Sequence, residues 1–311
     1  MTALGIDTSN YTTSAAVYNN LSGEVRQVKR MLPVKNGEKG LRQSDAVFLH
    51  TNQLHSVLSE LLSGFDDIID IVSVSARPRD AKGSYMPCFL VGLNTAKSIC
   101  SVTGLPLKEY SHQSGHIAAA AYSSGCLDLL KSEFIAFHVS GGTTEMLYVK
   151  PVYGDKMPFE VKIIGSTLDL NFGQAVDRLG VKFGLPFPCG KEIEKSAFLS
   201  EKVFKPAVSV KDGNCSVSGL ENKFKSMLDN GEKKEDVARF CLDYISHTLI
   251  KMTAFAHKNY GDLPVLFAGG VMSNKIIQAA VKEKFPLALF AQPDLSCDNA
   301  VGMALLPFVG K

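Results

Sequence analysis

Two histidines spaced four residues apart are the side chains of this sequence best suited to binding a metal ion. His112 and His116 occur in the run Tyr-Ser-His-Gln-Ser-Gly-His at 110–116. On a helix, residues at i and i+4 lie on the same face, so both imidazoles can reach one ion. The spacing predicts a metal site, although two ordinary surface histidines would give the same pattern.

A carboxylate far along the chain is the predicted third ligand. Asp298 lies in the run Ser-Cys-Asp-Asn at 296–299, where a strand is expected to end and a helix to begin. Two neutral imidazoles and one carboxylate leave positions open for substrate or water, and they suit iron and zinc alike. The alternative is that Asp298 serves only as a helix N-cap.

Three turns rich in glycine or hydroxyl groups are candidates for holding phosphate. They are Asp-Thr-Ser at 7–9, Ser-Gly-Gly-Thr-Thr at 140–144 and Gly-Gly-Val-Met-Ser-Asn at 269–274, and each follows a predicted strand. Glycine lets backbone N–H groups approach a phosphate closely, and hydroxyl groups add donors. Each turn alone is more often a plain β-turn, but the first two occupy matching positions in two halves of the chain. The nucleotide-binding candidates in these turns are Asp7, Ser9, Ser140, Gly141, Gly142, Thr143, Gly269 and Gly270.

Two acidic residues and one glycine between these turns suit the ribose and base of a nucleotide. Asp177 and Glu194 can accept hydrogen bonds from ribose hydroxyls, and Gly190 allows a base to come close. A solvated helix and a loop are the alternative interpretation of the same residues.

The elements that must position these residues repeat in outline. Alternation and turn residues predict strands at 3–7, 14–18 and 24–29, then a helix, a strand at 69–75 and a helix at 86–102. A similar order follows in the second half, with strands at 134–139, 145–149 and 159–164 and helical insertions. We therefore expect a duplicated α/β fold with a cleft between two lobes, residues 1–109 and 110–311, with the terminal helix able to pack on the first lobe.

Composition bounds the kind of protein. The 311 residues are 45% hydrophobic and 21% charged, which argues against disorder, and a net charge of +2 is smaller than a dedicated RNA-binding protein usually carries. Seven cysteines with no CxxC pair indicate free thiols in a reducing compartment. With no basic leader and no apolar run of about 18 residues, we expect a cytoplasmic protein that neither spans nor binds a membrane.

Six ordered sequence elements resemble the TsaD family, formerly called the O-sialoglycoprotein endopeptidases. The resemblance covers nearly the whole chain. The elements are HxxGH, Val-Ser-Gly-Gly at 139–142, GxxxDxxxxxxGLPxPxG, Ser-Gly-Leu at 218–220, GGVxxN and Cys-Asp-Asn at 297–299.

This resemblance implies a fold, an activity and a set of roles. The fold would be that of actin, sugar kinases and Hsp70-type ATPases, and the reaction would move a threonylcarbamoyl group from its adenylate to N6 of adenosine 37 in tRNA. The cofactors would be one divalent metal, iron or zinc, and an adenine nucleotide, threonylcarbamoyl-AMP or ATP. The partners would be tRNA, a shorter TsaD-like paralogue and an adenylate-forming enzyme. Residues matching the family's metal ligands, which we take as catalytic, are His112, His116 and Asp298; those matching adenylate positions are Val139, Ser140, Gly141, Gly142, Asp177, Gly190, Glu194 and Asn274.

Several departures leave other functions open. Tyr11 stands where the family carries a catalytic carboxylate, and residues 76–87 replace its Gly-Pro-Gly loop; the further changed positions are Thr143, Gln174, Cys189 and Glu221. A non-catalytic paralogue that still binds nucleotide and metal is the first alternative. A metallopeptidase is the last, because the helix lacks the Glu of HExxH. In the altered loop, Arg77, Arg79 and Lys82 are candidate contacts to RNA phosphates.

Overall fold

The computed structural model of the protein describes residues 1–33, 41–152, 158–295 and 299–309. Its first sheet has five strands in the order β3-β2-β1-β4-β5. The strands are β1 (Thr2–Asp7), β2 (Thr12–Asn19), β3 (Val25–Met31), β4 (Ile71–Arg77) and β5 (Leu107–Ser111). The first three pair in antiparallel fashion and β1, β4 and β5 are parallel, which confirms the antiparallel opening expected from the sequence.

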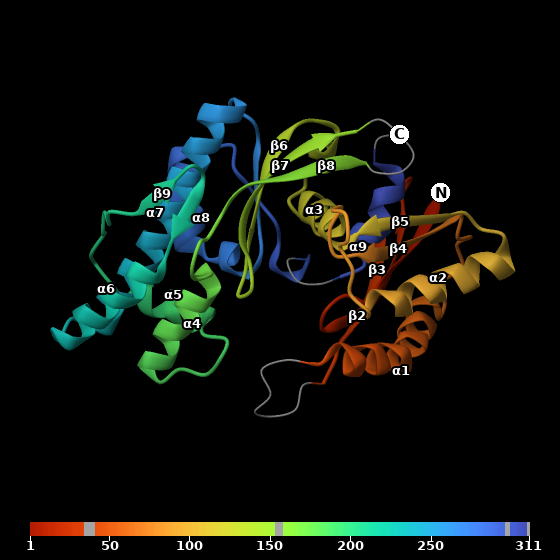
Figure 1. Cartoon of the computed structure of the whole chain (residues 1–311), viewed down its shortest axis with the longest axis horizontal. Coiled ribbons are helices and arrows are strands. Elements are labelled where there is room, and N and C mark those ends of the chain that lie inside the picture. The colour runs from red at the N-terminus through yellow and green to blue at the C-terminus, as the bar shows by residue number, and fades with distance from the viewer. Residues whose placement is uncertain (34–40, 153–157, 296–298, 310–311) are drawn as a thin grey trace. The chain divides into compact units, whose positions relative to one another are not determined.

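Helices cover both faces of this sheet. They are α1 (Gln43–Leu62), α2 (Phe89–Thr103), α3 (His112–Ser123), η1 (Leu127–Lys131), α9 (Val301–Leu305) and η4 (Leu306–Phe308). One face packs Leu4 and Val72 against apolar residues of α1 and α2, which lie side by side in Figure 1. The other face receives α9, where Ser73 Oγ donates to the carbonyl oxygen of Met303 at 2.6 Å. Gly5 has no side chain because a Cβ there would overlap the backbone of α9.

A second sheet repeats the plan of the first. Its order is β12-β11-β6-β7-β8, with an antiparallel pair β6-β7 and parallel pairs β6-β11 and β11-β12. The strands are β6 (Phe134–Val139), β7 (Thr144–Pro151), β8 (Phe159–Ser166), β11 (Val265–Ala268) and β12 (Leu289–Phe290). The shared strand order confirms the duplicated α/β fold.

The second half of the chain also contains helices, one of them 27 residues long. They are α4 (Phe172–Phe183), α5 (Gly190–Phe198), α6 (Ser218–Asp229), α7 (Lys234–Tyr260), α8 (Lys275–Lys284), η2 (Gly270–Ser273) and η3 (Pro293–Leu295), with a small hairpin of β9 (Ser209–Lys211) and β10 (Asn214–Ser216). Helix α7 packs against α4, α5, α6 and α8 (Figure 1). A single apolar core joins these helices to β6 and β11.

The chain divides into two compact units. Unit 1 comprises residues 1–132, 150–161 and 294–311, and unit 2 comprises residues 133–149 and 162–293. The lobe division at residue 109 and the cleft expected from the sequence stay predictions. Among the described residues, none of the helices is both long enough and apolar enough to cross a membrane.

Candidate functional site

The two predicted metal-binding histidines lie at the start of α3 in unit 1. The helix begins at His112 because Ser111 caps it, its side chain accepting a hydrogen bond from the backbone N–H of Ser114. One turn later His116 lies on the same face, and the two ring centroids are 4.2 Å apart. The structure therefore brings the imidazoles together as the spacing predicts.

A buried carboxylate orients the first of these imidazoles. Asp7 is 0% exposed at the end of β1, and its Oδ2 lies 3.1 Å from Nδ1 of His112. The neighbouring Ser9 donates to both carboxylate oxygens, from its backbone N–H and its hydroxyl, at 2.9 Å each. A carboxylate accepts only, so Nδ1 of His112 is the donor, and Nε2 is the nitrogen that would face a metal. Phosphate binding by Asp7 and Ser9 stays a prediction.

The imidazole nitrogens of His112 and His116 are suitable ligands for the predicted metal ion. Two imidazoles on one helix face, one of them oriented by a carboxylate, are the arrangement that zinc and iron sites commonly use. Asp298 lies outside the described residues. Over the described ranges, no three His, Cys, Asp or Glu side chains are grouped closely enough to hold an ion. The described structure thus contains two of the three predicted ligands, and their metal role stays a prediction.

The second candidate group is a glycine turn at the end of β6 in unit 2. The backbone N–H of Ser140 donates to the carbonyl of Thr143 at 2.7 Å, and Ser140 Oγ accepts from the N–H groups of Gly142 and Thr143. Gly141 and Gly142 are exposed. A Cβ on Gly173, at the start of α4, would lie 2.7 Å from the backbone of Gly141. The N-terminus of a helix therefore abuts a turn with exposed backbone, a combination that suits an anion.

The third turn meets the second because one residue lacks a side chain. Gly269 follows β11 with φ of 101°, a conformation that favours glycine, and a Cβ there would overlap the carbonyl oxygen of Val139. The space at Gly270 is open. The turns after β6 and β11 thus lie against each other at the ends of two parallel strands.

The remaining nucleotide-binding candidates make hydrogen bonds within the protein. Asp177 Oδ1 accepts from the N–H of Cys189 at 2.9 Å, and Glu194 Oε1 accepts from the N–H of Lys275. Asn274 caps α8, accepting from the second and third residues of that helix. Each carboxylate keeps further acceptor positions, so these contacts leave the ribose prediction untested. The space at Gly190 is open.

Three residues that depart from the family pattern make contacts within the protein. The Cys189 side chain is buried against Gly180. This burial is the main cause that raises the pKa of its thiol, and the negative charge of Asp177 raises it further. Gln174 completes the capping box of α4. Glu221 forms an ion pair with Arg178. Three of the changed positions therefore stabilise local structure.

Two further polar residues have intramolecular roles. Asp169 accepts from the N–H groups of Val217 and Ser218, at the start of α6. Arg77, a candidate RNA contact, forms an ion pair with Asp80 at 2.6 Å. Asp80 was not predicted from the sequence, where its only signal is its position three residues after an arginine.

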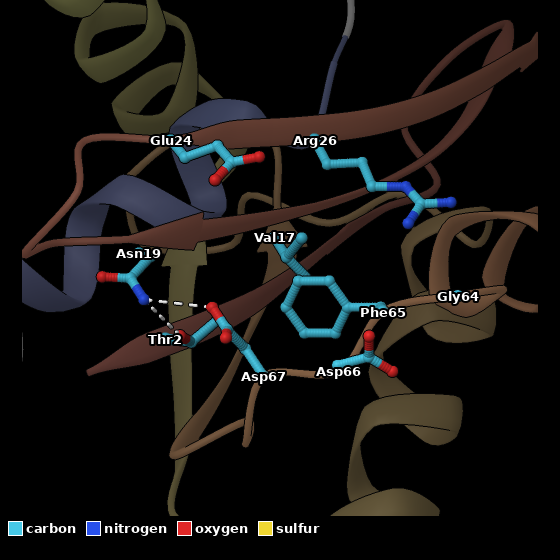
Figure 2. A pocket seen from close by; sticks show the side chains of 9 residues that line it. All are labelled: Thr2, Val17, Asn19, Glu24, Arg26, Gly64, Phe65, Asp66 and Asp67. Atoms are coloured by element: carbon cyan, nitrogen blue, oxygen red, sulfur yellow. Dashed lines mark hydrogen bonds between the residues drawn. The ribbon is translucent and has the colours of Figure 1, made fainter.

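A cavity of about 260 Å³ lies at the opposite end of the first sheet (Figure 2). Asn19 there donates to Thr2 Oγ1 and to Asp67 Oδ2, both at 3.2 Å, beside the ring of Phe65. The cavity adjoins the first residue of β1, whereas Asp7 is the last, about 17 Å away at the usual rise per strand residue. It contains none of the predicted site residues.

The repeated sheet and the glycine turns define the class of protein, an α/β protein of the actin-like ATPase and sugar-kinase fold. Component A of the (R)-2-hydroxyglutaryl-CoA dehydratase of Acidaminococcus fermentans matches with a TM-score of 0.56 at 16% identity, covering 98% of this chain and 96% of that one. A ROK family glucokinase from Streptomyces griseus matches with a TM-score of 0.53 at 15% identity, covering 98% of both chains. These similarities confirm the predicted fold.

The chain belongs to the TsaD family. The family model, described as tRNA N6-adenosine threonylcarbamoyltransferase, matches residues 40–305. The enzyme of that name from Bacillus licheniformis is 32% identical over 319 residues, covering 97% of this chain and 89% of the relative. The Bacillus subtilis enzyme is 30% identical over 330 residues, covering 98% and 89%. The resemblance inferred from the motifs is confirmed, and the chain is a member of an acyltransferase family whose named relatives act on tRNA.

Proposed function

We propose that this chain transfers a threonylcarbamoyl group from its adenylate to N6 of adenosine 37 in tRNA. The observation that carries the proposal is the pairing of His112 and His116 on one helix face, with Asp7 against the first ring, in a chain of the TsaD family. The glycine turns of unit 2 support it, because they combine exposed backbone N–H groups with a helix N-terminus.

In this proposal, His112, His116 and Asp298 hold one divalent ion, iron or zinc. When bound, the ion supplies a positive charge that polarises the carbamoyl carbonyl group. Asp7 holds the His112 ring in one tautomer and one orientation, because Nδ1 of that ring donates to its carboxylate.

The glycine turns bind the leaving group. We propose that the exposed backbone of the turn at Gly141 holds the adenylate phosphate, with Asp177 and Glu194 accepting from ribose hydroxyls. The N6 amine of adenosine attacks the carbamoyl carbon and loses a proton to solvent. The bond between this carbon and the phosphate oxygen breaks, and AMP leaves with the electron pair. Charge that develops on the phosphate is stabilised by these backbone donors.

The proposed reaction needs other molecules. The acceptor is tRNA, the donor comes from an adenylate-forming enzyme, and a shorter TsaD-like paralogue is the proposed protein partner. The altered loop at 76–87 is the proposed RNA contact, through Arg79 and Lys82; Arg77, paired with Asp80, is a less direct candidate.

Reconstitution tests this function directly. The purified chain is combined with ATP, threonine, bicarbonate, an adenylate-forming enzyme, the paralogue and tRNA, and the nucleosides are measured by mass spectrometry. We expect threonylcarbamoyladenosine from the wild-type chain and a loss of about 100-fold or more in His116→Ala, because one metal ligand is removed. His247→Ala, on α7 in unit 2, is the matched control and should retain activity. Equal activity in both variants would refute the metal role.

The second candidate function is a regulatory paralogue that binds nucleotide without turnover. It is favoured by Tyr11, which is 40% exposed at the position where the family carries a catalytic carboxylate. Tight adenine-nucleotide binding with no modified nucleoside in the reconstituted reaction would establish this candidate. Tyr11→Asp should then restore some activity.

A further inference from the structure

The segment that replaces the family's Gly-Pro-Gly loop is tied to the histidine helix by one carboxylate. Asp80 lies in this segment, between β4 and α2, with its side chain 13% exposed. Its Oδ1 accepts from two nitrogens of Arg77, Nε at 2.9 Å and Nη2 at 2.6 Å. Both bonds go to the same oxygen and are charge-assisted, so they hold this side of the carboxylate against the guanidinium.

The other oxygen of the same carboxylate reaches the first turn of α3. Asp80 Oδ2 accepts from the hydroxyl of Ser111 at 2.6 Å and from that of Ser114 at 3.0 Å. Both serines are 1% exposed, and Ser111 is the residue that caps the helix. A backbone bond from the N–H of Gln113 to the carbonyl of Pro78, at 3.1 Å, joins the same two segments.

These bonds surround a predicted metal ligand. His112 lies between Ser111 and Gln113, which are both held by the segment, and His116 follows one turn later. Four hydrogen bonds converge on Asp80, so its loss leaves the Arg77 guanidinium without this acceptor and leaves the two buried hydroxyls, which lie 2.9 Å apart, only each other. The first turn of α3 would then be held by fewer contacts, and both imidazoles would move with it.

We propose that Asp80 is a positioning residue that sets the geometry of the His112–His116 pair through the first turn of α3. It touches neither imidazole. The inference rests on the proposed metal role of these histidines, and it adds to that role a link between residues 76–87 and the ion. Partners one step removed from a metal ligand commonly change metal affinity by 10-fold or more.

Cobalt binding tests this role without any catalytic assay. Co²⁺ alone is titrated into the full-length wild-type chain and variants, and its visible absorption bands report both affinity and ligand geometry. We expect Asp80→Asn to weaken Co²⁺ binding about tenfold and to change the band shape, because Asn offers one acceptor oxygen in place of two. Ser114→Ala, which removes only one of the four hydrogen bonds to Asp80, should weaken binding less.

A second buried aspartate provides the matched control. Asp243 accepts from Nε of Arg239 at 2.9 Å with one oxygen and from the N–H of Phe204 at 2.8 Å with the other, in unit 2. Asp243→Asn should lower the melting temperature and leave the Co²⁺ affinity and spectrum unchanged. If Asp80 had a purely structural role, Asp80→Asn would likewise lower the melting temperature and leave the Co²⁺ affinity and spectrum unchanged.

The outcomes separate this inference from the proposed function. If His112→Ala abolishes Co²⁺ binding and Asp80→Asn binds as the wild type does, the positioning role is refuted and the metal role stands. If the wild type and His112→Ala bind Co²⁺ equally, the metal role fails, and the positioning role fails with it. If Asp80→Asn does not fold, Ser114→Ala decides: wild-type affinity and spectrum in that variant overturn the inference.

Discussion

At the scale of single residues, Gly269 shows how the absence of a side chain builds a candidate site. The residue has a positive φ and lies against the carbonyl of Val139, so two conditions disfavour any other amino acid there. The two strand ends, and with them the turns proposed to bind phosphate, can come together only under this restriction.

Replacing Gly269 separates these two conditions. Gly269→Ala adds backbone strain and a collision, whereas Gly261→Ala adds strain only, because Gly261 has a similar conformation with φ of 88° and open space around it. Strain of this kind costs about 1–3 kcal/mol. We expect both variants to lose stability in urea unfolding, Gly269→Ala more than Gly261→Ala. Calorimetry should show weaker AMP binding only in Gly269→Ala, and equal AMP affinity in both would contradict the proposed site.

At the scale of the elements, three helices have polar side chains that accept hydrogen bonds from the backbone at their starts. Ser111 caps α3, Asn274 caps α8, and Asp169 holds the start of α6. The unpaired N–H groups of a first turn need acceptors, and a carboxylate also interacts favourably with the helix dipole.

The pH dependence of stability should reveal the bond between Asp169 and α6. Burial alone would raise the pKa of this carboxyl, but hydrogen bonds from Ser218, Val217 and Leu170 outweigh it and lower the pKa to about 2. A depressed folded-state pKa stabilises the protein above the unfolded value near 4. The stabilisation is lost as pH falls from about 4 towards 2.

The measurement compares Asp169→Asn with the wild type in urea unfolding at several pH values. Because Asp169 is exposed, solvent screening reduces the expected loss near pH 7 to about 1 kcal/mol. The difference should shrink as the pH approaches 2. Asp229→Asn, at the other end of α6, is the control and should change stability by less than about 0.5 kcal/mol. A difference that does not vary with pH would contradict the role of the carboxylate charge.

At the scale of the whole molecule, charge and thiol burial are the two properties that bear on function. The net charge of +2 is too small to attract RNA without local contacts. Four of the six cysteines in the described ranges are buried, and three of these, Cys189, Cys215 and Cys241, belong to the core of unit 2.

Binding of tRNA should therefore depend on single exposed cations. Lys82→Glu should weaken tRNA binding and reduce the slope of log affinity against log salt by about 1. Lys211→Glu makes the same charge change on β9 and is the control. Binding can be followed by fluorescence anisotropy at several salt concentrations. Equal slopes in the two variants would show that residues 76–87 do not contact RNA.

Thiol labelling should report the integrity of unit 2. Burial raises the pKa of Cys215 and Cys241 to about 12, so both thiols stay protonated and unreactive at pH 8. Iodoacetamide with peptide mass mapping should label these two only after unfolding, while half-buried Cys100 and Cys126 react earlier. Rapid labelling of Cys241 in the native protein would contradict the described core.

Local patterns in the sequence were sufficient for the family, the fold and many of the elements. The four-residue spacing of His112 and His116 predicts their shared face, because helix geometry depends on the backbone alone. Alternating apolar residues predict β1, β2 and β6 to within about two residues. Strand β5 was not predicted, since five residues of mixed polarity carry little periodic signal.

The partners of the candidate site were decided only by the tertiary structure. Asp7 meets His112 across 105 residues, and Asp80 meets Ser111 across 31. These contacts depend on which strands become neighbours and in what register. Such long-range pairing leaves no local periodicity in the sequence. The residue types that can bind a metal could therefore be found in the sequence, whereas the carboxylates that orient them could be identified only after folding had placed the ends of β1, β4 and β5 side by side.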